Sequence, residues 1–330
     1  MSKHLDYVKY LPSVKVNGIL KVGTDCSGIE APIQALEILK IKYKHLFSSE
    51  IDPRTRNLIE CNYEPEIIYQ DITKRKHTEL PKLDLYVSGF PCQSFSGLGK
   101  REGFEDQRGR GTIFFECFET IKATKPEMFI LENVKGLTTH DDGQTFELIL
   151  EILNTLSYKI YHKIINTLDF GLPQNRERIY IIGLKKGKFN DYKFPEPIKL
   201  NVYVTDILET EIKEKTELTE HKKEILRDAV RNKTITPLKR KDPWVINLNC
   251  SSYKRSSPML NISPCLMASG AIYYVTTIQR NLTPIEFLRL QGFKRLEFCE
   301  EYSKIYSTAG NSMSVSVIAF LIASMIRSKK

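Results

Sequence analysis

Short apolar runs alternate with longer amphipathic ones from residue 19 to about residue 184. This alternation is typical of βαβ units, which build a parallel sheet. The apolar runs predict strands at residues 20–24, 45–49, 67–69, 83–88, 128–131, 159–165 and 178–184. The amphipathic runs predict helices at residues 32–39, 53–61, 112–123 and 145–156. The predicted fold class is α/β, a Rossmann-like, mostly parallel sheet with helices on both faces.

Two helix starts carry capping signals. Asp52 stands before Pro53, the order expected of an N-cap and a first helical proline. Residues 283–286, Thr-Pro-Ile-Glu, have the capping-box pattern with a proline in the first turn. We therefore expect one helix to begin near each site, and a last helix to follow residues 310–312.

The pattern changes near residue 185. A turn-rich stretch is followed by a charged segment up to about residue 240 and by a short strand-like run at residues 245–248. The helical pattern resumes at Arg280. This break predicts two domains, one of residues 1–185 and 280–330 and a smaller, irregular one of residues 186–279.

The chain is basic, with 49 Lys and Arg against 40 Asp and Glu, a formal net charge of +9. Much of the excess lies in residues 231–255, where seven basic residues accompany the single acid Asp242. This concentration favours a polyanionic partner.

Neither a membrane nor a metal is expected. The N-terminus lacks the apolar stretch of a signal peptide, and the apolar run at residues 315–326 is too short for a bilayer. The seven cysteines form no C-x-x-C pair and the six histidines form no cluster, which argues against a disulfide framework and a metal site. We expect a protein of a reducing, cytoplasmic compartment.

Cys92 follows the strand predicted at residues 83–88, within Ser-Gly-Phe-Pro-Cys-Gln-Ser-Phe-Ser at residues 88–96. A lone cysteine is most often a small buried hydrophobe. Here Pro91 stiffens the backbone before the sulfur, and the polar and glycine residues after it indicate an exposed loop. Loops beyond the carboxyl ends of parallel strands carry ligand sites, so Cys92 is a candidate nucleophile.

Three consecutive strand ends carry residues suited to a nucleotide-like cofactor. The first ends in a small-residue turn at Gly28, the second at the acid Glu50 and the third at the acid Asp71. Along one crevice they would supply a turn, a ribose acceptor and an acceptor for an adenine amino group. Each acid alone could equally be a solvated charge or a helix cap.

A further acid and two arginines are candidates for work on the substrate. Glu132 follows the apolar strand 128–131, where partial desolvation would raise the pKa of its carboxyl and let it donate a proton. Arg176 and Arg178 are two residues apart, so in extended backbone they would point to the same face. Both could reach the pocket, or one could brace the other.

In this order, the stretches resemble the DNA cytosine-5 methyltransferases that use S-adenosylmethionine. The most specific matches are Phe-Pro-Cys-Gln at residues 90–93 and Glu-Asn-Val at residues 132–134, and Gln-Asn-Arg-Glu-Arg at residues 174–178 follows. The resemblance implies four catalytic residues: Cys92, Glu132, Arg176 and Arg178. It implies that the cofactor is bound by Cys26, Ser27, Gly28, Ile29, Glu50, Ile51, Asp71, Ile72, Pro91, Ile113, Asn311 and Ser312.

The resemblance further implies a bacterial or phage enzyme of the restriction-modification type. Such an enzyme would act as a monomer on double-stranded DNA, leave S-adenosylhomocysteine as product, use no metal and have a cognate restriction endonuclease as genetic partner. Cys92 would add to a flipped-out cytosine, residues 94–111 would close over the base, and residues 186–279 would be the target-recognition domain.

The sequence departs from the family pattern in the cofactor motifs. Cys26 and Glu30 stand where the family usually has Phe and Gly, and Ile51 replaces a frequent aromatic residue. Two Arg-Gly pairs at residues 108–111 leave open which one matches the single pair of the family.

Two other functions compete with DNA methylation. Transfer-RNA cytosine-5 methyltransferases usually carry Pro-Pro-Cys-Gln and a Cys-Phe-Thr motif in the small domain, whereas here Phe90 precedes Pro91 and Cys117-Phe118 lies in the large domain. A catalytically inactive DNA-binding regulator would not need the four residues implied to be catalytic, all of which are present: Cys92, Glu132, Arg176 and Arg178.

Overall fold

The computed structural model describes residues 3–91, 113–294, 296–297 and 305–330. The chain divides into two compact units, each made of separate segments. Unit 1 comprises Met1–Tyr10, Asn166–Arg176 and Pro197–Ser316, and unit 2 comprises Leu11–Ile165, Glu177–Glu196 and Val317–Lys330. This division differs from the boundaries expected at residues 186 and 280, because residues 280–316 cluster with the segment that precedes them.

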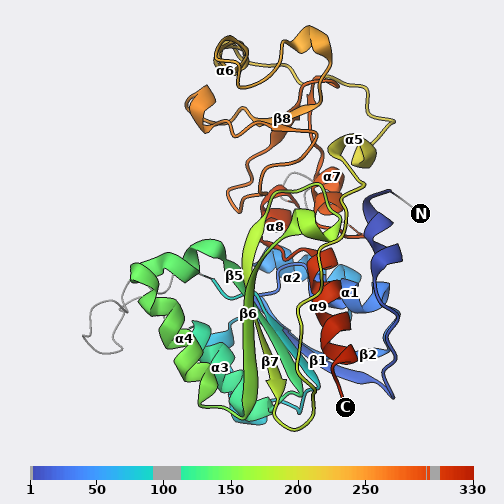
Figure 1. The fold of residues 1–330 in the computed structure, drawn as a ribbon, viewed down its shortest axis with the longest axis vertical. Coiled ribbons are helices and arrows are strands. Elements are labelled where there is room, and N and C mark those ends of the chain that lie inside the picture. Colours follow the sequence, from blue (N-terminus) through green and yellow to red (C-terminus); the bar gives the residue numbers. More distant parts are fainter. Residues whose placement is uncertain (1–2, 92–112, 295, 298–304) are drawn as a thin grey trace. The chain divides into compact units, whose positions relative to one another are not determined.

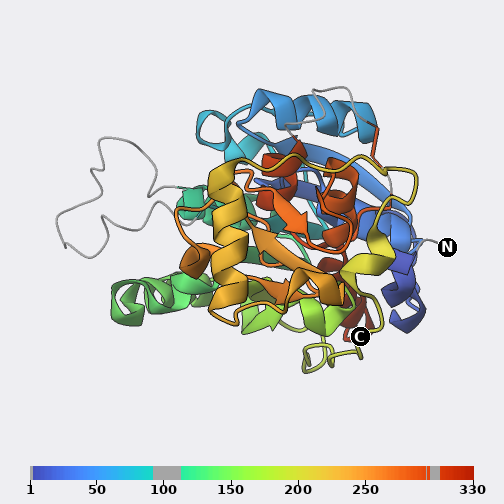
Figure 2. The same cartoon turned by 90° about the horizontal axis from the view of Figure 1, so that it is seen from above.

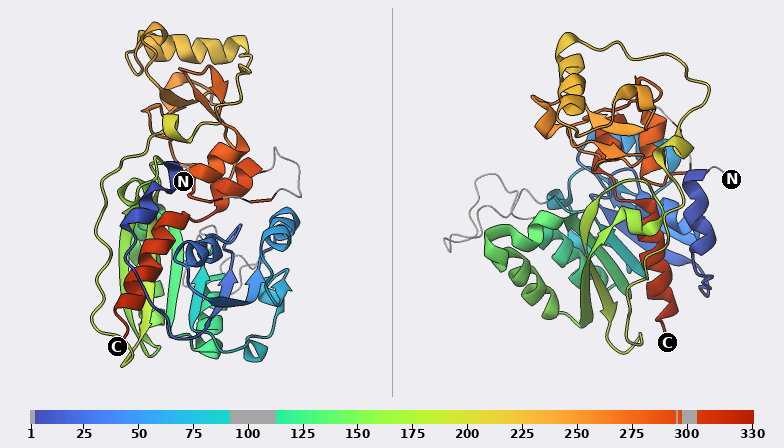
Figure 3. Two further views of the ribbon diagram at one scale, coloured as in Figure 1. Left: turned by 90° about the vertical axis from the view of Figure 1, so that its right-hand side faces the viewer. Right: turned by 45° about the horizontal axis from the view of Figure 1, so that its top comes forward.

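Unit 2 is built on a seven-stranded sheet with the order β3-β2-β1-β4-β5-β7-β6 (Figure 1). The strands β1 to β5 are parallel, and β7 is antiparallel to β5. Every strand predicted in this part of the chain is present: β1 Leu20–Asp25, β2 Tyr43–Ser49, β3 Ile68–Tyr69, β4 Leu85–Ser88, β5 Met128–Val134, β6 Tyr158–Asn166 and β7 Glu177–Lys185. Figure 3 shows the sheet from two further directions.

The strand order reverses between β1 and β4, the point at which doubly wound sheets open a crevice for a ligand.

Helices cover both faces of this sheet. The helices α3 and α4 pack through Phe114, Ile121 and Leu153 on one face, against Phe129 and its neighbours. Figure 1 shows α1 and α9 on the other side. As the sequence predicts, Asp52 caps α2 by accepting the Arg54 N–H. The bounds are α1 Ala31–Ile38, α2 Pro53–Asn62, α3 Ile113–Thr124, α4 Gln144–Asn154 and α9 Val315–Arg327.

Unit 1 contains a four-stranded antiparallel sheet with the order β11-β10-β8-β9. Its strands are β8 Trp244–Asn247, β9 Met259–Leu260, β10 Tyr273–Val275 and β11 Arg280–Asn281. Its helices are α5 Val204–Ile207, α6 Glu220–Arg231, α7 Pro284–Leu290 and α8 Ile305–Asn311. The capping box predicted at Thr283 is present at the start of α7.

Helix α6 runs beside this sheet (Figure 2) and has no counterpart among the helices that the sequence predicts. Its buried residues are only Ile225, Leu226 and Ala229, which pack on Ile246 and Tyr274. The remaining positions are mostly charged, so the apolar pattern is too sparse to separate this helix from a solvated segment.

Among the described residues one helical stretch, Ile305–Arg327, has the length and hydropathy of a membrane span, and 89% of its most apolar window is buried. Such burial is typical of a core helix.

Cys61 is disulfide-bonded, which the cysteine spacing did not predict. Spacing along the chain carries no information on which distant thiols meet in the fold.

Candidate active site

The carboxyl ends of β1, β2, β3 and β4 meet at one edge of the sheet in unit 2. Backbone hydrogen bonds join them beyond the regular ladders: Cys26 N–H to the Ser49 carbonyl at 2.8 Å, and Glu50 N–H to the Tyr69 carbonyl at 3.1 Å. The residues predicted to bind the cofactor at positions 26–29, 50–51 and 71–72 therefore lie at adjacent strand ends. The structure brings together this part of the predicted site.

The turn between β1 and α1 is tightly wound. Cys26, Gly28 and Glu30 have φ angles of 50°, 65° and 59°, and Glu30 is the N-cap of α1. The left-handed region costs a residue with a Cβ about 1–2 kcal/mol, so the fold holds two non-glycine residues against their preference. The turn brings its backbone sharply round at the end of the first strand.

Glu50 and Ile51 lie at the end of β2. Burial raises the pKa of the Glu50 carboxyl to about 7, although its Oε1 accepts the Asp52 N–H at 3.0 Å. The side chain of Ile51 is 74% exposed, unusual for a large aliphatic residue. An acceptor beside an exposed apolar side chain suits a ligand with a ribose and a flat ring.

Asp71 caps the short 3-10 turn η2, Ile72–Lys74, in which Ile72 is buried. Its Oδ1 accepts the Thr73 N–H at 2.9 Å and the Thr73 hydroxyl at 2.7 Å. Burial opposes ionisation of Asp71, but the hydrogen bonds from Thr73 outweigh burial and lower the pKa of the carboxyl. The cap that the sequence left as an alternative is thus present, and binding of an adenine amino group remains a prediction.

A buried ion pair that the sequence did not reveal braces this edge from inside. The Arg75 guanidinium donates to both Asp25 oxygens at 2.7 and 2.5 Å and to the Ser49 and Thr120 hydroxyls at 2.6 and 2.7 Å. The Tyr86 hydroxyl also donates to Asp25, at 2.7 Å. Arg75 lies in the run Thr-Lys-Arg-Lys, which looks like a solvated charge cluster, so no sequence signal marks it.

Glu132 and Arg178 form a pair across β5 and β7. The antiparallel register sets Arg178 opposite Val134, and its Nε lies 3.2 Å from Glu132 Oε1. Their side chains are 14% and 10% exposed, Arg178 and Glu132 respectively. The sequence left open whether both arginines reach the site or one braces the other. In the structure, Arg178 is in contact with Glu132.

Arg176 has a different environment, in unit 1. Its guanidinium donates to the carbonyls of Leu266 and Ser312 at 3.0 and 2.8 Å, and the residue is 3% exposed. It holds two separate chain segments of unit 1 together, as a bracing arginine would. Asn311, exposed, and Ser312, buried, also lie in unit 1.

The residues around the predicted nucleophile are described only on its flanks. Cys92, the loop 94–111 and both Arg-Gly pairs lie outside the described residues. On the near side Pro91 is exposed, and Phe90 is buried against Phe114. Asn133 donates its side-chain N–H to the Phe90 carbonyl at 2.9 Å, which ties the end of β5 to the chain two residues before Cys92.

Ile113, on the far side of that gap, is the first residue of α3 and packs against the apolar core.

The basic segment of unit 1 is accessible. All seven basic residues counted between positions 231 and 255 are exposed, several of them in the short turns η8 Leu238–Arg240 and η9 Tyr253–Arg255. Exposed lysine and arginine side chains can neutralise phosphates. In the part of the chain that the structure describes, no group of three or more His, Cys, Asp or Glu side chains could hold a metal ion.

Residues 25–327 match the C-5 cytosine-specific DNA methylase family. The chain is 40% identical over 291 residues to the type II methyltransferase M.HaeII of Haemophilus aegyptius. The matched residues cover 86% of each chain. It is 41% identical over 285 residues to the type II methyltransferase M.NgoBI of Neisseria gonorrhoeae, with 83% of each chain covered.

Solved structures share the fold. The S. pombe Dnmt2 methyltransferase has a TM-score of 0.67 at 19% identity, with 93% of this chain and 98% of that chain covered. The Entamoeba histolytica methyltransferase EhMeth has a TM-score of 0.60 at 15% identity, covering 94% and 99%. These likenesses confirm the predicted fold class, and the family match confirms the predicted family: this chain belongs to the C-5 cytosine-specific DNA methylases and is a DNA cytosine-5 methyltransferase.

Proposed function

We propose that this enzyme methylates carbon 5 of a cytosine flipped out of double-stranded DNA, through a covalent adduct with Cys92. The observation that supports this most is the Glu132–Arg178 pair at the end of β5. This strand neighbours β4, which leads into Phe-Pro-Cys-Gln at residues 90–93. The acid thus lies on the strand next to the one that leads to the nucleophile, and the arginine that would orient it lies on β7, on the other side of β5.

Carbon 5 of cytosine is a poor nucleophile, and covalent catalysis is a way round this. The Cys92 thiolate would form a bond to carbon 6, which turns carbon 5 into an enamine carbon able to attack a methyl group. Glu132 would donate a proton or a hydrogen bond to ring nitrogen 3, and Arg178 would orient Glu132 and hold the ring carbonyl. A base, which could be water, then removes the carbon 5 proton, and the bond between Cys92 and carbon 6 breaks.

The edge formed by β1, β2 and β3 suits S-adenosylmethionine, which supplies a methyl group on a positively charged sulfur when bound. Glu50 would accept from the ribose hydroxyls, Ile51 would cover the adenine, and Asp71 would accept from its amino group. The remaining proposed contacts are Cys26, Ser27, Gly28, Ile29, Ile72, Pro91, Ile113, Asn311 and Ser312, and S-adenosylhomocysteine would be the product.

The DNA must be distorted for this chemistry, because the reacting atoms of cytosine are inaccessible inside a duplex. We propose that residues 186–279 recognise the target sequence and that the exposed basic residues at 231–255 contact phosphates. The enzyme would act as a monomer.

The relatives are named as type II methyltransferases, so protection of DNA from a cognate restriction endonuclease is the proposed biological role. An enzyme that modifies DNA acts where the DNA is, which in a bacterium is the cytoplasm.

The decisive experiment offers S-adenosylmethionine with a labelled methyl group together with DNA or with transfer RNA. We expect label in DNA only, and no transfer by the Cys92→Ala variant. Label that enters only transfer RNA would refute DNA as the substrate, and an active Cys92→Ala protein would refute the covalent mechanism. Bisulfite sequencing of plasmid DNA from cells that express the enzyme would then give the recognition sequence.

A further inference from the structure

Glu30 is completely buried, although it belongs to the turn that we propose for the cofactor. A single oxygen of its carboxylate, Oε1, accepts hydrogen bonds from three hydroxyl groups: Thr24 at 2.8 Å, Ser27 at 2.9 Å and Ser48 at 2.6 Å. Thr24 is in β1, Ser27 is in the turn and Ser48 is in β2. This oxygen therefore joins three chain segments at the carboxyl edge of the sheet.

The backbone of Glu30 has an unfavourable conformation for a residue with a side chain. Glu30 has φ 59° and ψ 46°, a left-handed conformation that glycine adopts without cost. The family that the turn resembles usually has glycine at this position. A residue other than glycine is strained in this region, and it persists only where its surroundings hold it. The surroundings here are the three hydroxyl groups.

Burial adds a second cost, because a carboxylate loses its hydration inside the protein. Burial raises the pKa of the Glu30 carboxyl to about 7, against the opposing effect of the hydrogen bonds from Ser48, Thr24 and Ser27. No hydrogen-bond partner of the second oxygen, Oε2, exists among the described residues. A glycine would avoid both costs, so the side chain must contribute something that glycine cannot.

A second titratable side chain, His45 on β2, lies beside this cluster. Its Nε2 lies 4.0 Å from Glu30 Oε1 and 3.0 Å from the Thr24 hydroxyl oxygen. Burial lowers the pKa of His45 to about 4, so the ring is neutral at pH 7. Because the Thr24 hydroxyl donates to Glu30, the ring donates its Nε2–H to Thr24.

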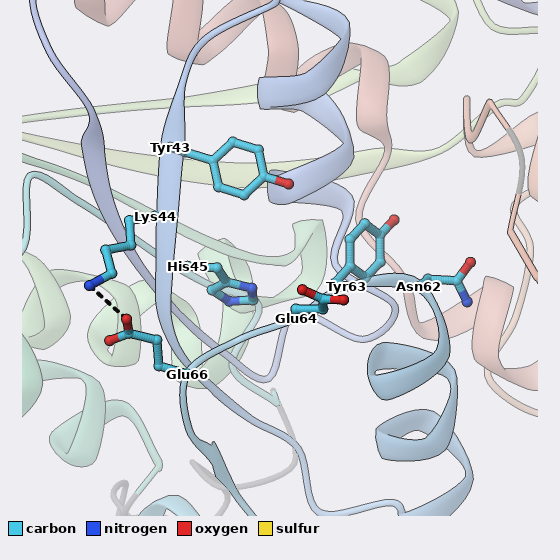
Figure 4. Close-up of a pocket in the computed structure, with 7 residues that line it drawn as sticks. All are labelled: Tyr43, Lys44, His45, Asn62, Tyr63, Glu64 and Glu66. Atoms are coloured by element: carbon cyan, nitrogen blue, oxygen red, sulfur yellow. Dashed lines mark ion pairs between the residues drawn. The ribbon is translucent and has the colours of Figure 1, made fainter.

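His45 also lies at the wall of a cavity. It lines a cavity of about 530 Å³ together with Tyr43, Tyr63 and four polar residues (Figure 4). The cluster of Glu30, Thr24, Ser27, Ser48 and His45 thus spans the interior between this cavity and the turn.

We infer that Glu30 is a positioning residue: its carboxylate holds Ser27, and with it the backbone of residues 26–29, in the geometry that receives S-adenosylmethionine. The inference rests on the cofactor site proposed above. A turn that is ordered before binding spares the ligand the entropic cost of ordering it. The carboxylate would act through Ser27 and would not touch the cofactor.

The test measures binding of S-adenosylhomocysteine by isothermal titration calorimetry, without DNA and without turnover. Glu30→Gly removes the carboxylate but keeps a residue that favours the left-handed backbone, so it separates the lost hydrogen bonds from backbone strain. We expect its dissociation constant to rise about tenfold or more, the equivalent of one strong positioning contact. Glu30→Gln keeps an acceptor oxygen, so we expect its dissociation constant to stay within about threefold of wild type.

Gln34→Ala is the matched control. Gln34 is buried one turn further along α1 and bonds to Glu37, away from the turn. Its loss should lower thermal stability and leave the affinity for S-adenosylhomocysteine unchanged. The Ser27→Ala variant, alone and combined with Glu30→Gly, completes a double-mutant cycle, in which the double variant should bind no more weakly than Glu30→Gly.

The outcomes separate this inference from the proposed function. If wild type binds S-adenosylhomocysteine and Glu30→Gly binds it equally well, the positioning role is refuted and the cofactor site stands. Equal weakening by Gln34→Ala and Glu30→Gly would also refute it, since general destabilisation would then explain both. If wild type does not bind S-adenosylhomocysteine at all, the proposed cofactor site fails, and this inference fails with it.

Discussion

Two arginine–carboxylate pairs of unit 2, Arg75–Asp25 and Arg178–Glu132, differ in how completely their neighbours enclose them. The side chains of Arg75 and Asp25 are 2% and 0% exposed, and hydroxyl groups of Ser49 and Thr120 accept further hydrogen bonds from the guanidinium. Those of Arg178 and Glu132 are 14% and 10% exposed, with a 3.2 Å contact at a strand end. An enclosed pair holds strands together, whereas a less enclosed ion pair at a strand end could also contact a substrate. The same two chemical groups therefore serve stability in one place and, as we propose, catalysis in the other.

The largest effect on stability is expected from Arg75→Ala. This change leaves the Asp25 carboxylate buried without its cation, which should lower the free energy of unfolding by about 3–5 kcal/mol. Urea titration measures the change. Arg178→Ala is the comparison, and its loss should stay below about 3 kcal/mol because this pair is less completely enclosed than Arg75 and Asp25. If both variants lose the same stability, the contrast between the pairs is wrong.

Glu132→Gln should reverse the balance between stability and activity. Loss of the proton donor should slow methyl transfer by about 10²- to 10⁴-fold, the usual contribution of a positioned acid. The unfolding midpoint should remain close to that of wild type, because the amide still fills the space beside Arg178. Single-turnover transfer of a labelled methyl group measures the rate. A fully active Glu132→Gln enzyme would contradict the role proposed for the less enclosed pair.

Glu30 is a third buried carboxylate, and no arginine is among the groups that shift its pKa. The way in which it changes stability with pH extends the comparison. The pKa of its carboxyl is about 7 in the folded protein, against 4.5 for a solvated glutamate such as an unfolded chain presents. Its contribution to stability is thus fully present below pH 4.5 and is lost as the pH rises to 7. Between these values wild type should lose up to about 3 kcal/mol relative to Glu30→Gln.

Unfolding curves of the two proteins at a series of pH values test this. Burial of neutral His45 acts in the opposite direction, with stability gained as the pH rises from 4 to 6.5, but it is present in both proteins and largely cancels. A difference in stability that does not change with pH would mean that Glu30 titrates normally.

The smallest effect on stability is expected where charges are fully exposed. The double change Lys239→Ala and Arg240→Ala should alter the free energy of unfolding by less than about 0.5 kcal/mol. If these side chains bind phosphates, DNA affinity should fall, and the slope of log affinity against log salt should decrease by about 1 for each phosphate that is no longer neutralised. Fluorescence anisotropy with duplex DNA measures both. An unchanged slope would remove these residues from the DNA interface.

Much of the sheet in unit 2 could be predicted because its strands are short apolar runs between helical segments. The edge that carries Gly28, Glu50 and Asp71 followed from the rule that parallel strands end on one side. Helix α6 could not be predicted, since so few of its residues are apolar. Arg75 was hidden in a charged run, and the choice between Arg176 and Arg178 depended on β7 running antiparallel beside β5, which spacing along the chain does not encode.

Unit 2 is assembled from segments that lie far apart in the sequence, which has a consequence for how the enzyme is synthesised. Val317–Lys330 belong to the same compact unit as Leu11–Ile165, and Phe189 bridges to Lys329. During synthesis on the ribosome, the first 165 residues emerge long before the segment that completes their core. The parallel sheet can therefore reach its final packing only after residues 317–330 have been synthesised. A chain interrupted before residue 317 would never complete this unit, and we expect it to have no methyltransferase activity.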